Sequence, residues 1–87
     1  MEIDFLAKAP EDIEFWKNTG NKIIQLRITK LLESISKTPY SGIGKPEPLK
    51  YELSGYWSRR ITDEHRLIYT VIGDRIKVIS LRFHYNP

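Results

Sequence analysis

Three chemically active side chains stand in short polar motifs in the second half of this chain. Glu47 lies between two prolines, Arg66 follows the Asp-Glu-His run, and His84 lies near the end of the printed sequence. A carboxylate can take a proton from a ribose 2′-OH, an arginine can hold a phosphate, and an imidazole can protonate a leaving oxygen. The sequence therefore contains the groups needed to cut RNA by attack of a 2′-OH on the adjacent phosphate.

Basic residues are frequent around these motifs. The formal net charge is +3 at pH 7, the sequence pI is about 9.3, and cations cluster between Lys45 and Arg82. This excess permits binding to a polyanion such as RNA but does not require it. For each arginine taken alone, the simpler interpretation is a surface ion pair with a nearby acid such as Asp63 or Glu64.

Size and composition exclude several classes of protein. The 87 residues are enough for one small domain, residues 1–87, with a two-layer core. The chain has no cysteine, and its two histidines lack a supporting carboxylate cluster in the sequence, so we expect no metal site and no cofactor. No apolar run approaches the ~20 residues that span a bilayer, and the acidic start lacks a signal-peptide core. A cytoplasmic location is expected, with no membrane partner.

Two helices are predicted after a short strand over residues 3–7. The run from Ala9 to Asp12 is typical of a helix start, because proline is tolerated and acids are favoured in the first turn. Gly20 can end this helix in the left-handed conformation. The next helix has an apolar stripe with three- and four-residue spacing, which indicates one buried face. The stripe consists of Ile24, Ile28, Leu31, Leu32 and Ile35.

The remainder of the chain is predicted to be a loop followed by strands. Residues 38–48 contain three prolines and two glycines, so we expect a loop there, which carries Glu47. Strands are expected over 51–53, 57–62, 65–72 and 76–84. The order β-α-α-β-β-β predicts an α+β domain, a small antiparallel sheet with two N-terminal helices packed on one face.

The alternation of polar and apolar residues in the last two strands predicts their register. A three-residue loop over Gly73–Arg75, or a bulge of equal parity, separates the two kinds of side chain most cleanly. One face then carries Arg66, Ile68, Thr70, Val78, Ser80, Arg82 and His84. The other face, expected beneath the helices, carries Leu67, Tyr69, Val71, Ile79, Leu81 and Phe83. His65 is interpreted as a structural turn or strand residue, and Tyr56 and Trp57 as core or sheet-edge aromatics.

Several ordered motifs resemble those of the YoeB toxins within the RelE-like superfamily. The resemblance is close from Thr38 to Tyr85 and looser over the two helices. It rests on the segments Gly44–Lys50, Leu53–Ile61 and Glu64–Tyr69 and on the His84-Tyr85 pair. It implies an mRNA endonuclease that acts in the ribosomal A site and is silenced by a YefM-type antitoxin. It also implies contact with operator DNA only within the toxin–antitoxin complex, and it leaves a homodimer open.

The resemblance also implies roles for individual residues. The general base of the family falls on Glu47, its phosphate-binding arginine on Arg66, its general acid on His84 and the adjacent tyrosine on Tyr85. Three further positions lie at basic sites of the same cleft in the family, namely Lys50, Arg60 and Arg82. The sequence departs from the family pattern up to Lys8 and in the two residues after Tyr85.

Two other functions use the same cations. A basic domain could occupy the ribosome or RNA and block translation without cutting it, and a structural module could use its polar face to dock an acidic protein. The pair of Glu47 and His84 favours cleavage, because binding alone does not need a base and an acid. Product analysis distinguishes these functions, since neither alternative would break mRNA.

Overall fold

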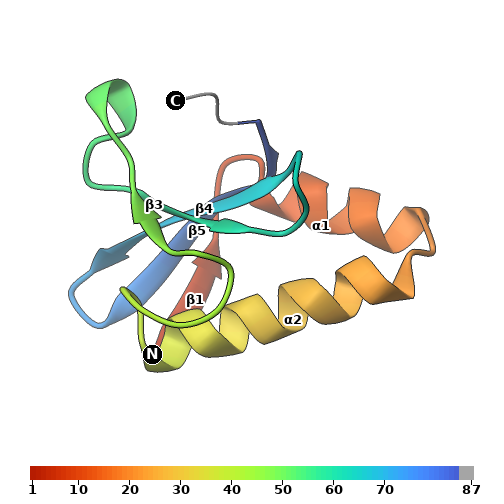
Figure 1. Cartoon of the computed structure of the whole chain (residues 1–87), viewed down its shortest axis with the longest axis horizontal. Coiled ribbons are helices and arrows are strands. Elements are labelled where there is room, and N and C mark those ends of the chain that lie inside the picture. The colour runs from red at the N-terminus through yellow and green to blue at the C-terminus, as the bar shows by residue number, and fades with distance from the viewer. Residues whose placement is uncertain (85–87) are drawn as a thin grey trace.

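The computed structural model describes residues 1–84 and shows two helices on one side of a five-stranded sheet (Figure 1). The elements in chain order are β1 (Glu2–Phe5), α1 (Ala9–Asn18), α2 (Lys22–Lys37), β2 (Glu47–Pro48), the 3-10 helix η1 (Tyr51–Leu53), β3 (Trp57–Arg60), β4 (Arg66–Ile72) and β5 (Arg75–Phe83). The strand order across the sheet is β1-β5-β4-β3-β2. The predicted α+β class is confirmed. In the described part of the chain, neither helix is long and apolar enough to cross a membrane.

Local signals in the sequence explain the bounds of both helices. Pro10 lies in the first turn of α1, and Asp12 is one of two acids there. The side chain of Asn21 caps α2 by accepting a hydrogen bond from the backbone N–H of Ile24 (3.1 Å). Between the helices, Gly20 has a φ of 69°, the left-handed conformation that ends a helix without steric cost. The predicted helix positions are thus confirmed.

The core lies between the helices and one face of the sheet. The predicted stripe of α2 contributes its most buried residues, Ile28, Leu31 and Ile35. Trp16 of α1 joins them. The sheet contributes Leu67, Tyr69, Ile76, Val78 and Leu81, all fully buried. Burial of about ten such side chains at roughly 1.5–3 kcal/mol each is the main force that holds the helices on the sheet.

The sheet is mixed, which corrects the prediction of an antiparallel sheet. β1 pairs with β5 in parallel, with Ile3 opposite Ile76. A parallel pair needs a long connection between its strands, and α1, α2 and β2–β4 supply it here. Asp4 secures this edge strand, because its carboxylate forms ion pairs with Arg75 and Lys77 of β5.

Two predictions between residues 47 and 53 were also wrong. Residues 51–53 form a single 3-10 turn and no strand, since Tyr51 has a φ of 58° and Ser54 donates back to the Tyr51 carbonyl (3.0 Å). η1 projects away from α2 in Figure 1. Conversely, Glu47 and Pro48 were predicted to lie in a loop but form the edge strand β2, which pairs antiparallel with β3. Proline is tolerated at such an edge.

The β4–β5 hairpin has a two-residue turn, so the predicted three-residue loop is wrong. Ile72 pairs with Arg75, and Gly73 takes a φ of 62° at the first turn position, where tight hairpins favour glycine. This register places Val78 opposite Tyr69 in the core, so Val78 is not on the polar face. Ile79, in turn, is not part of the core cluster.

Two irregularities then restore part of the predicted pattern. From the Tyr69–Val78 pair to the Ile68–Ser80 pair, β4 advances by one residue and β5 by two. β5 gains one more residue before Arg66 pairs with Phe83. Leu81 therefore returns to the core as predicted. Phe83 does not lie beneath the helices, since it stands opposite Arg66 and outside the core cluster.

Candidate functional site

Glu47 stands at the exposed edge of the sheet on the two-residue strand β2. It pairs with Ser58 of β3, which in turn pairs with Ile68 of β4. Because directly paired residues share a face and Ile68 alternates with core residues, Glu47 points to the face opposite the helices. Glu47 itself is exposed, so its carboxylate can meet a ligand on that side, while Ser58 and Ile68 beside it are buried.

A buried arginine holds the loop that leads to Glu47. Arg59 is 0% exposed, and all five of its N–H groups donate hydrogen bonds. The acceptors are Tyr69 Oη (3.2 Å), Ser34 Oγ (2.8 Å), and the carbonyls of Ile43 (3.0 Å), Thr38 (2.8 Å) and Ser41 (2.8 Å). Three of the five acceptors are loop carbonyls, so this guanidinium fixes the path of residues 38–43.

Tyr69 completes this anchor from β4. Its Oη accepts the bond from Arg59 Nε and donates to the carbonyl of Pro39. Burial raises the pKa of the Tyr69 hydroxyl above its ordinary value of 10.0, and the nearby guanidinium opposes that rise. The phenol therefore stays protonated and able to donate at neutral pH. Neither Arg59 nor Tyr69 was predicted from the sequence as a support of the site.

The chain turns sharply between this anchor and Glu47. Gly44 has a φ of 82°, which favours glycine, and a Cβ there would lie 2.6 Å from Leu31 Cδ2, so a larger residue would strain the backbone and displace Leu31. Its carbonyl accepts a short hydrogen bond from the N–H of Arg60 (2.7 Å). Lys45 follows with a φ of 50°, a strained value for a residue with a side chain. These contacts set the direction in which Pro46 and Glu47 approach β3.

Two arginines face each other on the open side of the sheet. Arg60 of β3 pairs directly with Arg66 of β4. They lie on the same face as the Ser58–Ile68 pair, because Arg60 is two residues after Ser58 and Arg66 is two residues before Ile68. Like charges directly opposite destabilise a sheet. Within residues 1–84, neither guanidinium lies within ion-pair distance of a carboxylate, so the repulsion is not neutralised by a salt bridge.

Arg66 is positioned by the turn before β4. Its Nη1 donates to the carbonyls of Thr62 (3.0 Å) and Asp63 (3.1 Å). These are backbone acceptors, so the surface ion pair considered from the sequence does not form among the described residues. The positive charge of Arg66 stays available on the half-buried side chain.

His84 lies beside His65, a juxtaposition that the sequence did not indicate. The two rings meet edge to face with centroids 5.0 Å apart. His65 packs in the same way against Trp16 (5.1 Å), and the Trp16 indole donates to the carbonyl of Leu81 (2.9 Å). His84 follows the last residue of β5, so these ring contacts, and not strand register, place it. The contact with Trp16 fits the structural role predicted for His65, which is also a neighbour of the proposed acid.

Arg82 departs from the predicted polar face. Its guanidinium lies 3.5 Å from the centroid of the Phe15 ring on α1, a cation–π contact. The physical reason is the second irregularity of β5, which puts Phe83 and not Arg82 opposite Arg66. Arg82 and His84 instead line a hollow of about 380 Å³ with Lys8 and the buried Asp12. Arg82 therefore lines this hollow, whereas Arg66 does not.

The geometry brings several of the predicted residues onto the open side of the sheet. Glu47 lies on β2, and Arg60, Arg66 and Phe83 form a row across β3, β4 and β5, with His84 the next residue. The backbones of β2 and β4 are about 10 Å apart, a span that long side chains and one nucleotide bridge. Lys50 is exposed just before η1, close in sequence to Glu47. Tyr85 lies outside the described residues.

The family model for YoeB-like toxins of bacterial type II toxin–antitoxin systems matches residues 5–85. The chain belongs to this family. The YoeB toxin of Mycobacterium bovis is 51% identical over 83 residues, which cover 95% of this chain and 96% of that protein. A YoeB/ParE toxin from Agrobacterium tumefaciens has a TM-score of 0.91 with 45% identity, covering 98% of this chain and 100% of that one.

Two solved structures of YoeB from Staphylococcus aureus show assemblies. One is a complex of YoeB with YefM, with a TM-score of 0.86 and 45% identity. The other is a YoeB dimer, with a TM-score of 0.87 and 44% identity. Each covers 98% of this chain and is itself covered to 98%. These matches confirm the resemblance to the YoeB toxins drawn from the sequence motifs.

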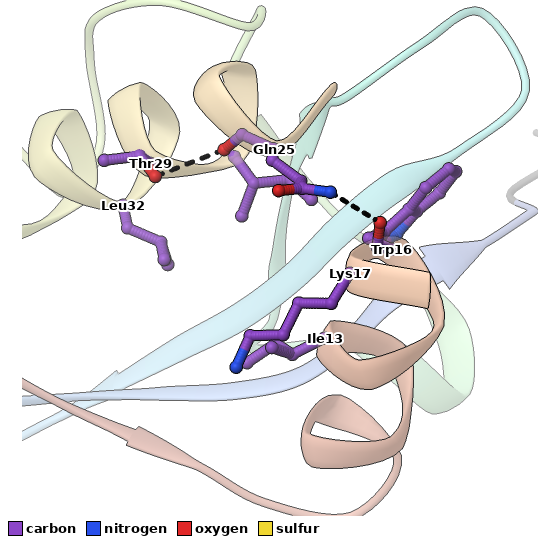
Figure 2. Close-up of a pocket in the computed structure, with 7 residues that line it drawn as sticks. Ile13, Trp16, Lys17, Gln25, Thr29 and Leu32 are labelled. Atoms are coloured by element: carbon purple, nitrogen blue, oxygen red, sulfur yellow. Dashed lines mark hydrogen bonds between the residues drawn. The ribbon is translucent and has the colours of Figure 1, made fainter. Parts of the chain in front are cut away.

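A second hollow of the toxin lies between its two helices (Figure 2). It measures about 250 Å³ and is lined by Ile13, Trp16, Lys17, Gln25, Ile28, Thr29 and Leu32. Gln25 closes one end by donating to the carbonyl of Trp16 (3.0 Å), as Figure 2 shows. The lining is mostly apolar, with Lys17 as its one charged residue, and it contains none of the site residues predicted from the sequence.

Proposed function

We propose that this YoeB-like toxin is an endoribonuclease that cleaves mRNA in the ribosomal A site. The observation that carries the proposal is the opposed pair of Arg60 and Arg66 beside an exposed carboxylate, Glu47. Two like charges without an acidic partner among residues 1–84 cost stability, and a bound phosphate would offset that cost. Membership of the toxin family supports the same conclusion.

In the proposed reaction, Glu47 removes the proton of the 2′-OH on the nucleotide before the cut. The 2′-oxygen attacks the adjacent phosphorus, and the bond from phosphorus to the 5′-oxygen of the next nucleotide breaks. The RNA itself supplies the nucleophile, so the mechanism requires no metal ion. The products are a 2′,3′-cyclic phosphate, or the 3′-phosphate from its hydrolysis, and a 5′-OH.

The other residues act on the charge and on the leaving group. Arg66, helped by Arg60 and Lys50, stabilises the negative charge that builds on the phosphoryl oxygens. His84 donates a proton to the departing 5′-oxygen. Tyr85 stacks on a base or orients the phosphate. Arg82, held over Phe15, contacts the RNA chain beyond the cut, next to the hollow that it shares with Lys8 and His84.

The proposed partners follow from the same cationic face. We propose that an acidic, partly disordered segment of a YefM-type antitoxin covers the site around Glu47, Arg66 and His84. The YoeB–YefM complex from Staphylococcus aureus supports this partner, and the YoeB dimer from that organism supports a homodimer. Operator DNA would be contacted only within the toxin–antitoxin complex. The toxin would meet the ribosome in the cytoplasm.

The decisive experiment is single-turnover cleavage of an A-site message, with ribosome binding measured in parallel. A single 2′-deoxy sugar before the cut should abolish cleavage but leave binding unchanged. Glu47→Gln and His84→Ala should each slow cleavage by on the order of 10²- to 10⁴-fold, the usual contribution of a positioned base or acid. Arg66→Ala should cost at least as much, since it removes charge stabilisation in the transition state.

Glu52→Gln is a matched control, because Glu52 is an exposed acid on η1 outside the paired row. It should cleave at the wild-type rate. Rapid cutting of the deoxy message would mean that water or a protein group attacks, and the mechanism would have to be abandoned. Tight ribosome binding with intact mRNA in every case would identify a non-catalytic translation inhibitor instead.

A further inference from the structure

Three metal-ligating side chains meet at the end of β5. Glu64, His65 and His84 each offer one ligand atom, and these atoms all lie within 4.8 Å of one another. They come from two segments that are far apart in the sequence, and they include both histidines of the chain. From this geometry we propose that the toxin binds a transition-metal dication of the Zn²⁺ type through Glu64, His65 and His84.

The donor set determines which ion fits. Two imidazoles and one carboxylate, with a water in the fourth position, form a common tetrahedral zinc site. Ligand atoms around zinc lie about 3.3 Å apart, given metal–ligand bonds of about 2.0–2.1 Å. Glu64 and His84 are exposed, so their side chains can rotate the remaining distance. Mg²⁺ and Ca²⁺ prefer oxygen ligands and should not compete.

The turn before β4 holds two of the three ligands in place. The hydroxyl of Thr62 accepts hydrogen bonds from the backbone N–H groups of Glu64 (3.2 Å) and His65 (3.0 Å). The carbonyl of His65 accepts from the N–H of Ile61 (3.0 Å). The Trp16 ring packs against the His65 ring. These contacts hold the backbone of Glu64 and His65 and the ring of His65, so less entropy is lost when the ion arrives.

One nitrogen of His65 has no hydrogen-bond partner. Nδ1 of this ring is buried and unpaired within the described residues. Most buried polar atoms are paired, so such an atom calls for an explanation. A metal ion bound to Nδ1 would supply the partner that this buried nitrogen lacks.

Metal binding would have a consequence for cleavage, which rests on the role proposed above for His84. An imidazole nitrogen that is bonded to a metal cannot deliver a proton to a leaving oxygen. Zn²⁺ would therefore inhibit the endonuclease by engaging its acid. The binding site itself does not depend on that role and is tested without RNA.

The binding test uses tag-free toxin and the fluorescence of Trp16, whose ring lies 5.1 Å from that of His65. Trp57→Phe removes the other tryptophan of the chain. In this background Ni²⁺ should quench the Trp16 emission at one ion per chain, Zn²⁺ should displace Ni²⁺, and Mg²⁺ should have no effect. Calorimetry with Zn²⁺ alone should give the same stoichiometry.

Variants of the ligands decide the assignment. Glu64→Gln and His84→Gln should each weaken Zn²⁺ binding at least about tenfold, since even outer residues of metal sites contribute 10–100-fold. Asp63→Asn is the matched control, because it removes the same charge one residue away without removing a ligand. Equal weakening by Asp63→Asn, or undiminished binding after Glu64→Gln, would overturn the site.

Cleavage assays separate this inference from the proposed function. If the toxin cuts mRNA, micromolar Zn²⁺ should inhibit wild-type toxin and inhibit Glu64→Gln at least tenfold less strongly, in line with its weaker binding. If Zn²⁺ binds as predicted but the protein never cuts RNA, the metal site stands and the proposed function fails. If cleavage proceeds but no Zn²⁺ binds, the proposed function stands and the metal site fails.

Discussion

Arg60 and Arg66 stand directly opposite each other on β3 and β4, on the side of the sheet away from the helices. A cross-strand pair of like charges costs about 0.2–1 kcal/mol. Arg66 is held by turn carbonyls, whereas Nε of Arg60 is buried and has no hydrogen-bond partner within residues 1–84. A fold that keeps this pair loses stability, and a polyanionic ligand would offset the loss.

Arg60→Gln should therefore make the toxin more stable and less active. We expect the free energy of unfolding in urea to rise by about 0.5 kcal/mol, because the like-charge contact is removed. Inorganic phosphate should stabilise the wild type more than NaCl of equal ionic strength does, and this difference should shrink in the variant. Lys30→Gln, on the exposed face of α2, is the control. A loss of stability larger than that of the control would contradict the interpretation.

Arg59 provides the second prediction. Arg59→Lys keeps the charge but cannot supply five N–H donors to the loop carbonyls, Ser34 and Tyr69. Several buried acceptors would lose their partners, and each costs about 1–3 kcal/mol. We expect a loss of at least about 3 kcal/mol in urea unfolding. Arg27→Lys is the matched control, since Arg27 donates to one carbonyl, that of Arg60. An Arg59→Lys variant as stable as wild type would show that contacts other than those of Arg59 hold the loop.

The helices and the core stripe of α2 were predictable because their signals are local. The three- and four-residue spacing from Ile24 to Ile35, the acids after Pro10 and the left-handed Gly20 each act within a few residues. The register of β5 was not predictable from alternation, because two irregularities add residues to one strand only. A two-residue turn followed by one such shift and a three-residue loop without a shift give the same pairing of Ile68 with Ser80.

Of the site, the sequence predicted residue types better than their arrangement. Glu47, Arg66 and His84 stood out by type and motif, but the neighbours His65 and His84 are brought together only by the fold. Arg59 was missed because a charged residue is normally assigned to the surface. The position of Arg59 in β3 indicated that it is buried. It alternates with Ser58 and therefore lies on the same face as Trp57, which packs on the core.

Acid should weaken the edge of the sheet at β1. The hydrogen bonds from Arg75 and Lys77 hold the pKa of Asp4 well below its ordinary value of 3.8. A carboxyl with a lowered pKa adds stability at pH values above its unfolded pKa, and this contribution is lost as the pH falls through the folded pKa. Asp4→Asn should therefore be less stable than wild type at pH 7, and the difference should shrink as the pH falls below 3.8.

Urea unfolding at a series of pH values measures this difference. Asp74→Asn is the control, because Asp74 is an exposed acid in the hairpin turn and forms no ion pair within residues 1–84. Its stability should follow the wild-type curve. A constant difference between Asp4→Asn and wild type down to pH 2 would show that the ion pairs with Arg75 and Lys77 add no pH-dependent stability.

The last prediction concerns the contact between α1 and β5 beyond the end of β1. Past Val78, no strand among residues 1–84 pairs with the outer edge of β5, and α1 covers it. Asp12 accepts from the N–H of Leu81 (2.9 Å), and the Trp16 indole donates to the carbonyl of Leu81 (2.9 Å). Asp12 is only 5% exposed. Asp12→Ala would leave a buried N–H unpaired, at a cost of about 1–3 kcal/mol.

Hydrogen exchange at single amides tests this directly. In Asp12→Ala the Leu81 amide should lose protection far more than the Tyr69 amide in the middle of the sheet, because only the former loses its acceptor. Asp12→Asn should be milder, since its side-chain oxygen can still accept. Glu11→Gln, an exposed acid in the same helical turn, is the control and should leave Leu81 unchanged. Since β5 carries Arg82 and His84 just beyond Leu81, cleavage should fall with Leu81 protection across the three variants. Full protection of Leu81 in Asp12→Ala would show that α1 does not hold this end of the site.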